Sequence, residues 1–106
     1  MDYNKFDNDA NSSETDYFAF VQWLCEHTAA ELRQAKGNRE QQKSVLCRYY
    51  KRGLRANLTT GELIDFLGVS TPSILDKAGF DDEEADEVMA VSNSLTDEDI
   101  NQATLA

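Results

Sequence analysis

Apolar residues recur at intervals of three and four along most of the chain, and this spacing places them on one face of an α-helix. Ser13, with Asp16 three residues later, has the pattern of a helix start. Gly37 is predicted to end this first helix, because glycine adopts the left-handed conformation of a helix C-terminus without steric cost. The stripe between them consists of Tyr17, Phe20, Val21, Leu24, Cys25, Thr28 and Leu32, with Phe18 and Trp23 partly off it.

The same signals divide the rest of the chain into further helices. Asn38 with Gln41 is predicted to start a second helix, and Gly53 to end it. The apolar face of that helix is Val45, Leu46 and Tyr49. Later starts are predicted at Thr59 with Glu62, at Thr71 before Pro72, at Asp81 with Glu84, and at Thr96 with Asp99; Gly68 and Gly79 are expected to end the third and fourth helices.

These elements predict an all-α fold, because no run of alternating β-branched residues suggests a strand. We expect a compact single-domain bundle of five or six helices, in which shorter helices close over two longer antiparallel ones. Residues 13–104 are predicted to form this domain, after a flexible acidic N-terminal segment, 1–12. The expected core is Phe20, Val21, Leu24, Leu32, Val45, Leu46, Leu63, Leu67, Ile74, Leu75, Val88 and Met89.

The composition fits one globular domain. The chain has 106 residues, of which 41% are hydrophobic and 28% are charged. It contains no long apolar run, and its start lacks the basic and apolar regions of a signal peptide, so we expect no membrane contact and a cytoplasmic location. Cys25 and Cys47 lie in helical patterns and are interpreted as small buried thiols, with a disulfide or a reactive pair as the alternative.

The charge is distributed unevenly along the chain. The net charge is −10, yet residues 31–55 hold eight of the ten cations against only two carboxylates, Glu31 and Glu40. That segment therefore carries +6 and the rest of the chain −16. After Lys77 there is no cation, although the acidic stretches FDDEEADEV and TDEDI follow. Such asymmetry points to a partner rather than to a fold.

The sequence contains no recognisable catalytic constellation. His27 is the only histidine; catalysis by a thiol or a serine would need it paired across the fold, so it is interpreted as structural or exposed. There is no HExxH motif, phosphate-binding glycine loop or paired metal-binding cysteines. The run Asp81–Glu84 lacks the spacing and the glycine of a calcium loop, and carboxylates at a helix start complement the helix dipole. We expect no enzyme, cofactor, metal or small-molecule substrate.

The octapeptide RYYKRGLR, residues 48–55, concentrates cations around two tyrosines. On a helix, Tyr49 would turn to the core edge and Tyr50 to a flank. Cations along a backbone, with aromatic rings under the bases, are the elements of single-strand binding. This interpretation assigns contacts with single-stranded DNA to Arg39, Lys43, Arg48, Tyr50, Lys51, Arg52 and Arg55, with Tyr50 stacking on a base.

Two alternatives stay open for these charges. The basic residues can form a solvated face that pairs with the excess acid of the protein itself. The acidic end can instead dock, as a mimic of phosphates, on a nucleic-acid-binding partner. The residues of that alternative partner-binding surface are Asp81, Asp82, Glu83, Glu84, Asp86 and Glu87.

Residues 58–75, LTTGELIDFLGVSTPSIL, resemble a helix-turn-helix, with Gly68 at the turn. Ile64 occupies a place usually taken by a small residue, and the second helix offers one cation, Lys77, beside Asp76. Phosphate contacts dominate affinity for a duplex. We therefore interpret the segment as helix packing without major-groove reading, and keep a DNA-binding transcription regulator as an alternative function.

The chain as a whole resembles the phage anti-CRISPR inhibitors, including those against type I-E systems. The resemblance is one of kind: a small acidic helical protein with FDDEEADEV as an acidic helix, RYYKRGLR as a basic one and no catalytic motif. Those inhibitors share no diagnostic motif, so the resemblance assigns no residue. It implies a non-enzymatic inhibitor in the cytoplasm of the host cell. Such a protein blocks a CRISPR effector complex by occupying a protein surface or its single-stranded DNA.

Overall fold

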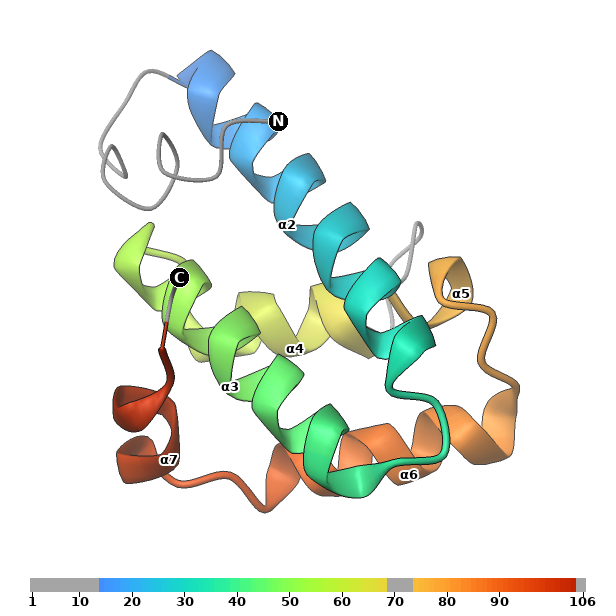
Figure 1. The fold of residues 1–106 in the computed structure, drawn as a ribbon. Helices are drawn as coiled ribbons and strands as arrows, with labels where there is room; N and C mark the ends of the chain where they lie inside the picture. Colours follow the sequence, from blue (N-terminus) through green and yellow to red (C-terminus); the bar gives the residue numbers. More distant parts are fainter. Residues whose placement is uncertain (1–13, 69–73, 105–106) are drawn as a thin grey trace.

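The computed structural model describes residues 14–68 and 74–104, and within them it shows an all-α fold without a strand. Two longer helices run antiparallel, and shorter helices close over them (Figure 1). This arrangement confirms the predicted fold class. The helices are α2 (Glu14–Gln34), α3 (Arg39–Arg55), α4 (Thr60–Gly68), α5 (Ile74–Lys77), α6 (Asp82–Asn93) and α7 (Asp97–Gln102).

The turn between α2 and α3 follows the sequence signals closely. Gly37 has a φ of 80°, the left-handed conformation that glycine adopts without cost. The side chain of Asn38 then accepts a hydrogen bond of 3.1 Å from the backbone N–H of Gln41. This bond satisfies one of the N–H groups left open at the start of α3. Both predictions for this turn are confirmed.

The prediction that Gly53 ends α3 is wrong. The helix continues to Arg55, and Asn57, with a φ of 67°, takes the left-handed position after it. The N–H groups of Asn57 and Leu58 bond to the carbonyls of Leu54 and Gly53, which is the Schellman pattern of a helix end. Gly53 instead lets α4 approach α3, because a Cβ added there would lie 2.3 Å from a methyl carbon of Leu63.

The short helices begin at their predicted capping residues wherever the structure describes them. Thr59 and Glu62 exchange hydrogen bonds of 3.1 and 3.2 Å, which form a capping box. Two more boxes join Asp81 to Glu84 and Thr96 to Asp99. Gly79, with a φ of 78°, follows α5 as predicted. The predicted starts at Ser13 and Thr71, and the N-terminal segment 1–12, lie outside the described residues.

The core agrees with the predicted one at ten of its twelve positions. Val21 and Met89 are only partly buried and pack against its edge. Trp23 and Tyr50 are buried as well, although the sequence pattern put both off the apolar faces. Cys25 and Cys47 are free buried thiols, as interpreted.

Helix α3 contacts four other helices, α2, α4, α6 and α7. Of the six cations of α3, Arg52 is buried and Arg48 and Lys51 are half-buried by this packing, whereas the other three are exposed. Helix α5 packs against α2 and α4. Across the residues that the structure describes, no helix combines the length and apolar character needed to cross a membrane.

Candidate functional site

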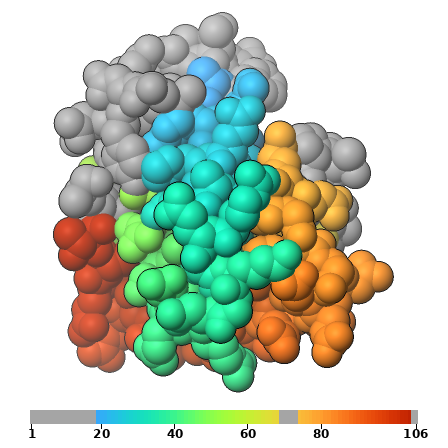
Figure 2. Space-filling view, turned by 45° about the vertical axis from the view of Figure 1, so that its right-hand side comes forward, coloured from blue at the N-terminus to red at the C-terminus, as the bar shows by residue number. Residues whose placement is uncertain are grey.

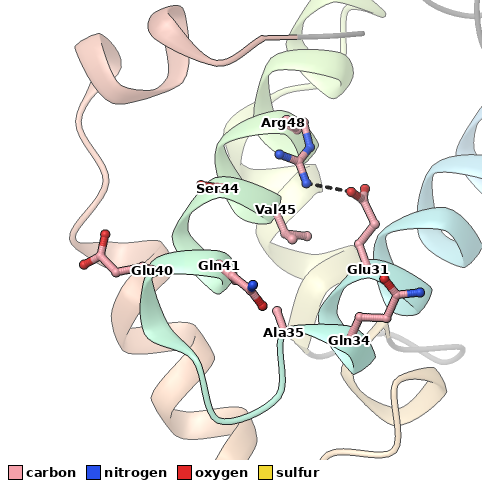
Figure 3. A pocket seen from close by; sticks show the side chains of 8 residues that line it. All are labelled: Glu31, Gln34, Ala35, Glu40, Gln41, Ser44, Val45 and Arg48. Carbon is pink, nitrogen blue, oxygen red and sulfur yellow. Dashed lines mark hydrogen bonds and ion pairs between the residues drawn. The ribbon is translucent and has the colours of Figure 1, made fainter.

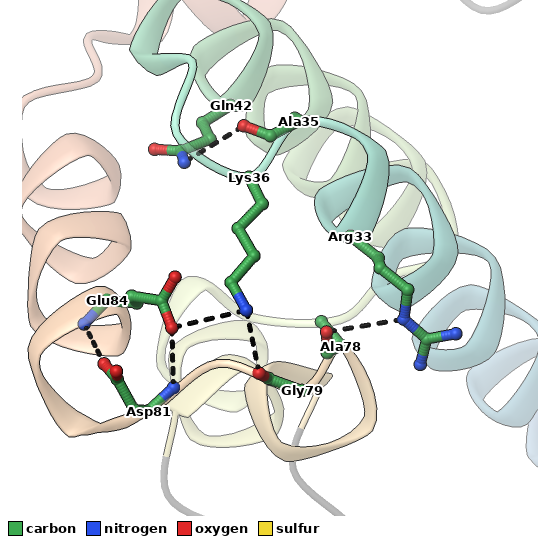
Figure 4. A network of polar contacts seen from close by, with 8 residues as sticks. All are labelled: Arg33, Ala35, Lys36, Gln42, Ala78, Gly79, Asp81 and Glu84. Atoms are coloured by element: carbon green, nitrogen blue, oxygen red, sulfur yellow. Dashed lines mark hydrogen bonds and ion pairs between the residues drawn. The ribbon is translucent and has the colours of Figure 1, made fainter.

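The last turn of α2 and the turn that follows it direct two cations to backbone carbonyls. Arg33 donates to the carbonyls of Lys77 and Ala78 at the end of α5. Lys36 donates to the carbonyl of Gly79 at 3.2 Å and pairs with Glu84 of α6 at 3.4 Å (Figure 4). Cations are favourable at a helix C-terminus, where carbonyls are left open and the dipole is negative. These two side chains thus join α2 to α5 and α6.

Glu31 of α2 gathers three cationic or titratable side chains. Its carboxylate accepts a hydrogen bond of 2.6 Å from Arg48 and lies 3.6 Å from the guanidinium of Arg52. His27, one turn earlier, is 3.3 Å away and stacks on Trp23. His27 is thus held between the ring of Trp23 and the carboxylate of Glu31. Burial lowers the pKa of Arg52 to about 10, because loss of hydration disfavours the charged guanidinium.

Arg52 is not positioned to contact a phosphate. Its side chain is only 2% exposed. Its guanidinium lies 5.7 Å from the centroid of the Trp23 ring, a cation–π distance. The sequence interpretation placed Arg52 on an open cationic face. It missed this burial because Trp23 and Glu31 approach from another helix.

Tyr50 is buried too, and a base cannot stack on it in this fold. Its ring is 3% exposed, and its hydroxyl shares a hydrogen bond with Ser92 of α6. Tyr49 lies in the core as predicted, and its hydroxyl donates to the carbonyl of Leu63. The two rings meet edge to face at 5.2 Å. Burial raises the pKa of both hydroxyls.

Two further cations of α3 contact α7. The ammonium of Lys51 donates to the carbonyls of Asn101 and Ala103 at 2.8 and 2.7 Å. Lys43 lies 3.8 Å from the carboxylate of Asp99. Most of the predicted nucleic-acid contacts thus already have partners inside the protein. Of the seven residues, Arg39, Lys43 and Arg55 are exposed, Arg48 and Lys51 are half-buried, and Tyr50 and Arg52 are buried.

Open cavities lie on both sides of the first half of α3. One, of about 420 Å³, separates α2 from α3, and the pair of Arg48 and Glu31 crosses one end of it (Figure 3). Another, of about 430 Å³, lies between α3 and α7 and reaches Cys47. In the space-filling view the turn between α2 and α3 is central, with α5 and α6 on one side and α7 on the other (Figure 2). Both cavities have mixed charge, so neither selects an anion or a cation.

The acidic residues of α6 contrast with the basic residues of α3. Asp81 and Glu84 are engaged in the capping box, and Glu84 also pairs with Lys36. The other four carboxylates are exposed, and no cation among the described residues pairs with them. They are Asp82, Glu83, Asp86 and Glu87.

The described part of the helix-turn-helix segment is packed inward. Ile74 and Leu75 of α5 are buried, and the helix lies against α2. The carbonyl of Lys77 is occupied by Arg33. Val69 and Thr71 lie outside the described residues.

Comparisons with protein-family models, with characterised proteins and with solved structures gave no match to this chain. Within the ranges that the structure describes, no three histidine, cysteine or acidic side chains gather into a group that could hold a metal ion. The candidate surfaces are therefore compared on their own geometry and charge.

Proposed function

We propose that this protein acts by binding, as a non-enzymatic inhibitor of the anti-CRISPR type, and that α6 is its contact surface. In this proposal the acidic face of α6 docks on a cationic nucleic-acid-binding surface of a CRISPR effector complex. The observation that carries it is the contrast between α3 and α6. The cations of α3 are largely engaged within the protein, whereas four exposed carboxylates of α6 have no described ion pair.

The spacing of these carboxylates suits a surface that follows a chain of cations. Asp82 and Asp86 are four residues apart, as are Glu83 and Glu87, so each pair lies on one side of the helix. Like charges at this spacing destabilise a helix by about 0.2–0.5 kcal/mol per pair. Lysines or arginines of a partner would remove this repulsion.

The electrostatics of the whole molecule favour the same kind of partner. A net charge of −10 attracts the protein to a cationic surface over distances longer than any single contact. CRISPR effectors hold guide and target strands in positively charged channels. An acidic helix that enters such a channel would compete with the nucleic acid for the same cations.

A charge-neutralised variant tests this proposal. We would replace Asp82 and Asp86 with Asn, and Glu83 and Glu87 with Gln, and measure retention by a purified type I-E effector complex. If each contact contributes about 0.5 kcal/mol, the four changes weaken binding roughly thirtyfold. In this proposal the unaltered protein blocks binding of the target strand by the complex, and the neutralised variant should block it correspondingly less.

The matched control changes the same number of exposed carboxylates elsewhere. It carries Glu26→Gln, Glu40→Gln, Asp65→Asn and Asp97→Asn, so its net charge equals that of the α6 variant. This control should bind the effector nearly as well as the unaltered protein. If the two variants lose binding equally, overall charge rather than α6 is responsible. If the unaltered protein does not bind the complex, the proposed partner is wrong.

A further inference from the structure

A line of cations runs along the whole of α3 at every fourth residue. Side chains spaced by four residues form a continuous ridge on a helix, and neighbours along it are about 6 Å apart along the helix axis. The central position of this ridge is a buried thiol instead of a cation. The residues are Arg39, Lys43, Cys47, Lys51 and Arg55, and we call them the α3 ridge.

Helix α7 lies over the centre of the α3 ridge. It supplies negative groups to both inner cations: the carboxylate of Asp99 faces Lys43, and the last carbonyls of the helix bond to Lys51. Between these two contacts, Cys47 lines the cavity that separates α3 from α7. The outer cations, Arg39 and Arg55, are exposed on either side of the region that α7 covers.

Helix α7 is short and largely exposed. It has six residues, none of them buried, and its apolar residue Ile100 is only partly covered. A helix this short is not stable alone, so it persists only through its contacts with α3 and its capping box. Its polar contacts with Lys43 and Lys51 are exposed or only partly buried. Segments of this kind open at a much lower free energy than the core.

We propose that α7 is a displaceable cover, and that the α3 ridge beneath it binds the phosphate backbone of single-stranded nucleic acid. Asp99 and the carbonyls of Asn101 and Ala103 present oxygen acceptors to Lys43 and Lys51, as phosphate oxygens would. Displacement of α7 would join the two inner cations to the two outer ones along a line that winds about 160° around α3. This inference concerns α3 and α7 and does not depend on the proposed role of α6.

The geometry favours a flexible single strand over a duplex. One strand can follow one inclined line of charges, whereas a duplex brings a second row of phosphates towards the acidic helices that flank α3. Because Tyr50 is buried, the track offers no stacking ring, and binding should depend little on base sequence. Four neutralised phosphates give a slope of log affinity against log salt of roughly −3.

If only molecules with α7 displaced bind a single strand, the apparent affinity equals the intrinsic affinity multiplied by the fraction of molecules that are open. Variants that release α7 should therefore raise the exposure of Cys47 and the affinity for a single strand together. Asp99→Ala removes both the pair with Lys43 and half of the capping box. Asp97→Ala is the matched control, because it removes the same charge from the same turn without touching either contact.

The first measurement is the rate at which each thiol of the folded full-length protein reacts with an alkylating reagent. Quenched samples are digested, and mass spectrometry quantifies the peptides that carry Cys25 and Cys47 separately. Asp99→Ala should speed the reaction of Cys47 about five- to tenfold, the effect of losing a cap and a surface ion pair, and Asp97→Ala less than about twofold. Cys25, a buried residue of α2, serves as the internal control for global unfolding.

The second measurement is the binding of a labelled oligothymidylate strand by fluorescence anisotropy. Asp99→Ala should bind about five- to tenfold more tightly than Asp97→Ala, and adding Lys43→Ala and Lys51→Ala should abolish that gain. Ile100→Ala provides a second release variant without a change of charge. It should raise Cys47 reactivity and strand affinity in the same proportion.

Several results would overturn the inference. An unchanged Cys47 rate in both release variants would show that α7 is not displaceable. Faster Cys47 reaction without tighter strand binding would show that the ridge is not a nucleic-acid site. Equal affinity for a duplex would contradict the single-strand assignment. If Cys25 reacts faster in step with Cys47 in both release variants, α7 is a structural part of the core and not a cover.

Discussion

Replacing Gly53 with alanine tests a close contact between α3 and α4. The added Cβ would lie 2.3 and 2.9 Å from the methyl carbons of Leu63 and 3.1 Å from its Cγ. Leu63 is fully buried, so its side chain cannot turn into solvent to make room. Its carbonyl is also tied to the hydroxyl of Tyr49. Helix α4 would therefore have to move away from α3.

The expected loss of stability follows from two opposing effects. Overpacking a core contact of this kind costs about 1–3 kcal/mol, whereas alanine is favoured over glycine inside a helix by about 1 kcal/mol. Because a 2.3 Å contact is far below the van der Waals distance, we take the upper part of the overpacking range, about 2–3 kcal/mol, and expect Gly53→Ala to lower the free energy of unfolding by about 1–2 kcal/mol. In a domain of this size that lowers Tm by about 5 °C or more.

Gly61→Ala in α4 is the matched control. A Cβ at that exposed position meets nothing closer than the hydroxyl oxygen of Thr59 at 3.9 Å, an ordinary contact. The control should be neutral or stabilising by up to about 1 kcal/mol. Chemical denaturation followed by circular dichroism measures both variants. Equal or greater stability of Gly53→Ala would refute the role of Gly53 in the α3–α4 contact.

Three more predictions follow from the polar contacts. Glu31→Gln should lower the free energy of unfolding by about 1–3 kcal/mol, because it weakens the partly buried bond to Arg48. Glu40→Gln, at an exposed position, is the control and should change the free energy of unfolding by less than about 0.5 kcal/mol. Urea denaturation compares the two variants. Tyr50→Phe should cost about 1 kcal/mol by removing the bond to Ser92, and should leave single-strand affinity unchanged in the Asp99→Ala background, as anisotropy would measure. Hydrogen bonds from the backbone and side chain of Thr96, together with Lys43, lower the pKa of Asp99 below its ordinary value of 3.8. Asp99 should therefore stabilise the contact of α7 with α3 fully above about pH 4, and this stabilisation should disappear as the pH falls through the lowered pKa. NMR titration of α7 would detect this transition, and the Asp99→Asn variant should lack it.

Three of the basic residues of this acidic protein bond to backbone carbonyls near helix ends. Arg33, Lys36 and Lys51 each reach carbonyls that follow or end another helix. Such contacts satisfy backbone acceptors that short helices leave open. A chain built from several short helices has many such ends, which accounts for the use of cations here better than surface ion pairing alone.

The sequence by itself determined the helices and their boundaries. Asn38 with Gln41 and Asp81 with Glu84 are cap pairs separated by three residues, so the physical cause of each helix start lies within one turn of chain. The periodic apolar stripes likewise identified core positions correctly at ten of the twelve predicted residues. Gly53 was the exception, because a glycine suits both a helix end and a close helix contact, and the position of α4 decides between them.

Only the tertiary structure decided what the charged and aromatic side chains do. Lys51 bonds to a carbonyl 50 residues away, and Tyr50 to a serine 42 residues away. Neither partner is marked in the sequence, because a long side chain on a helix surface can face solvent or another helix with the same local pattern. The basic segment therefore looked like an open track for nucleic acid. Packing of α2, α6 and α7 around α3 buried two of its members and covered its centre, because α3 is the helix that the others surround.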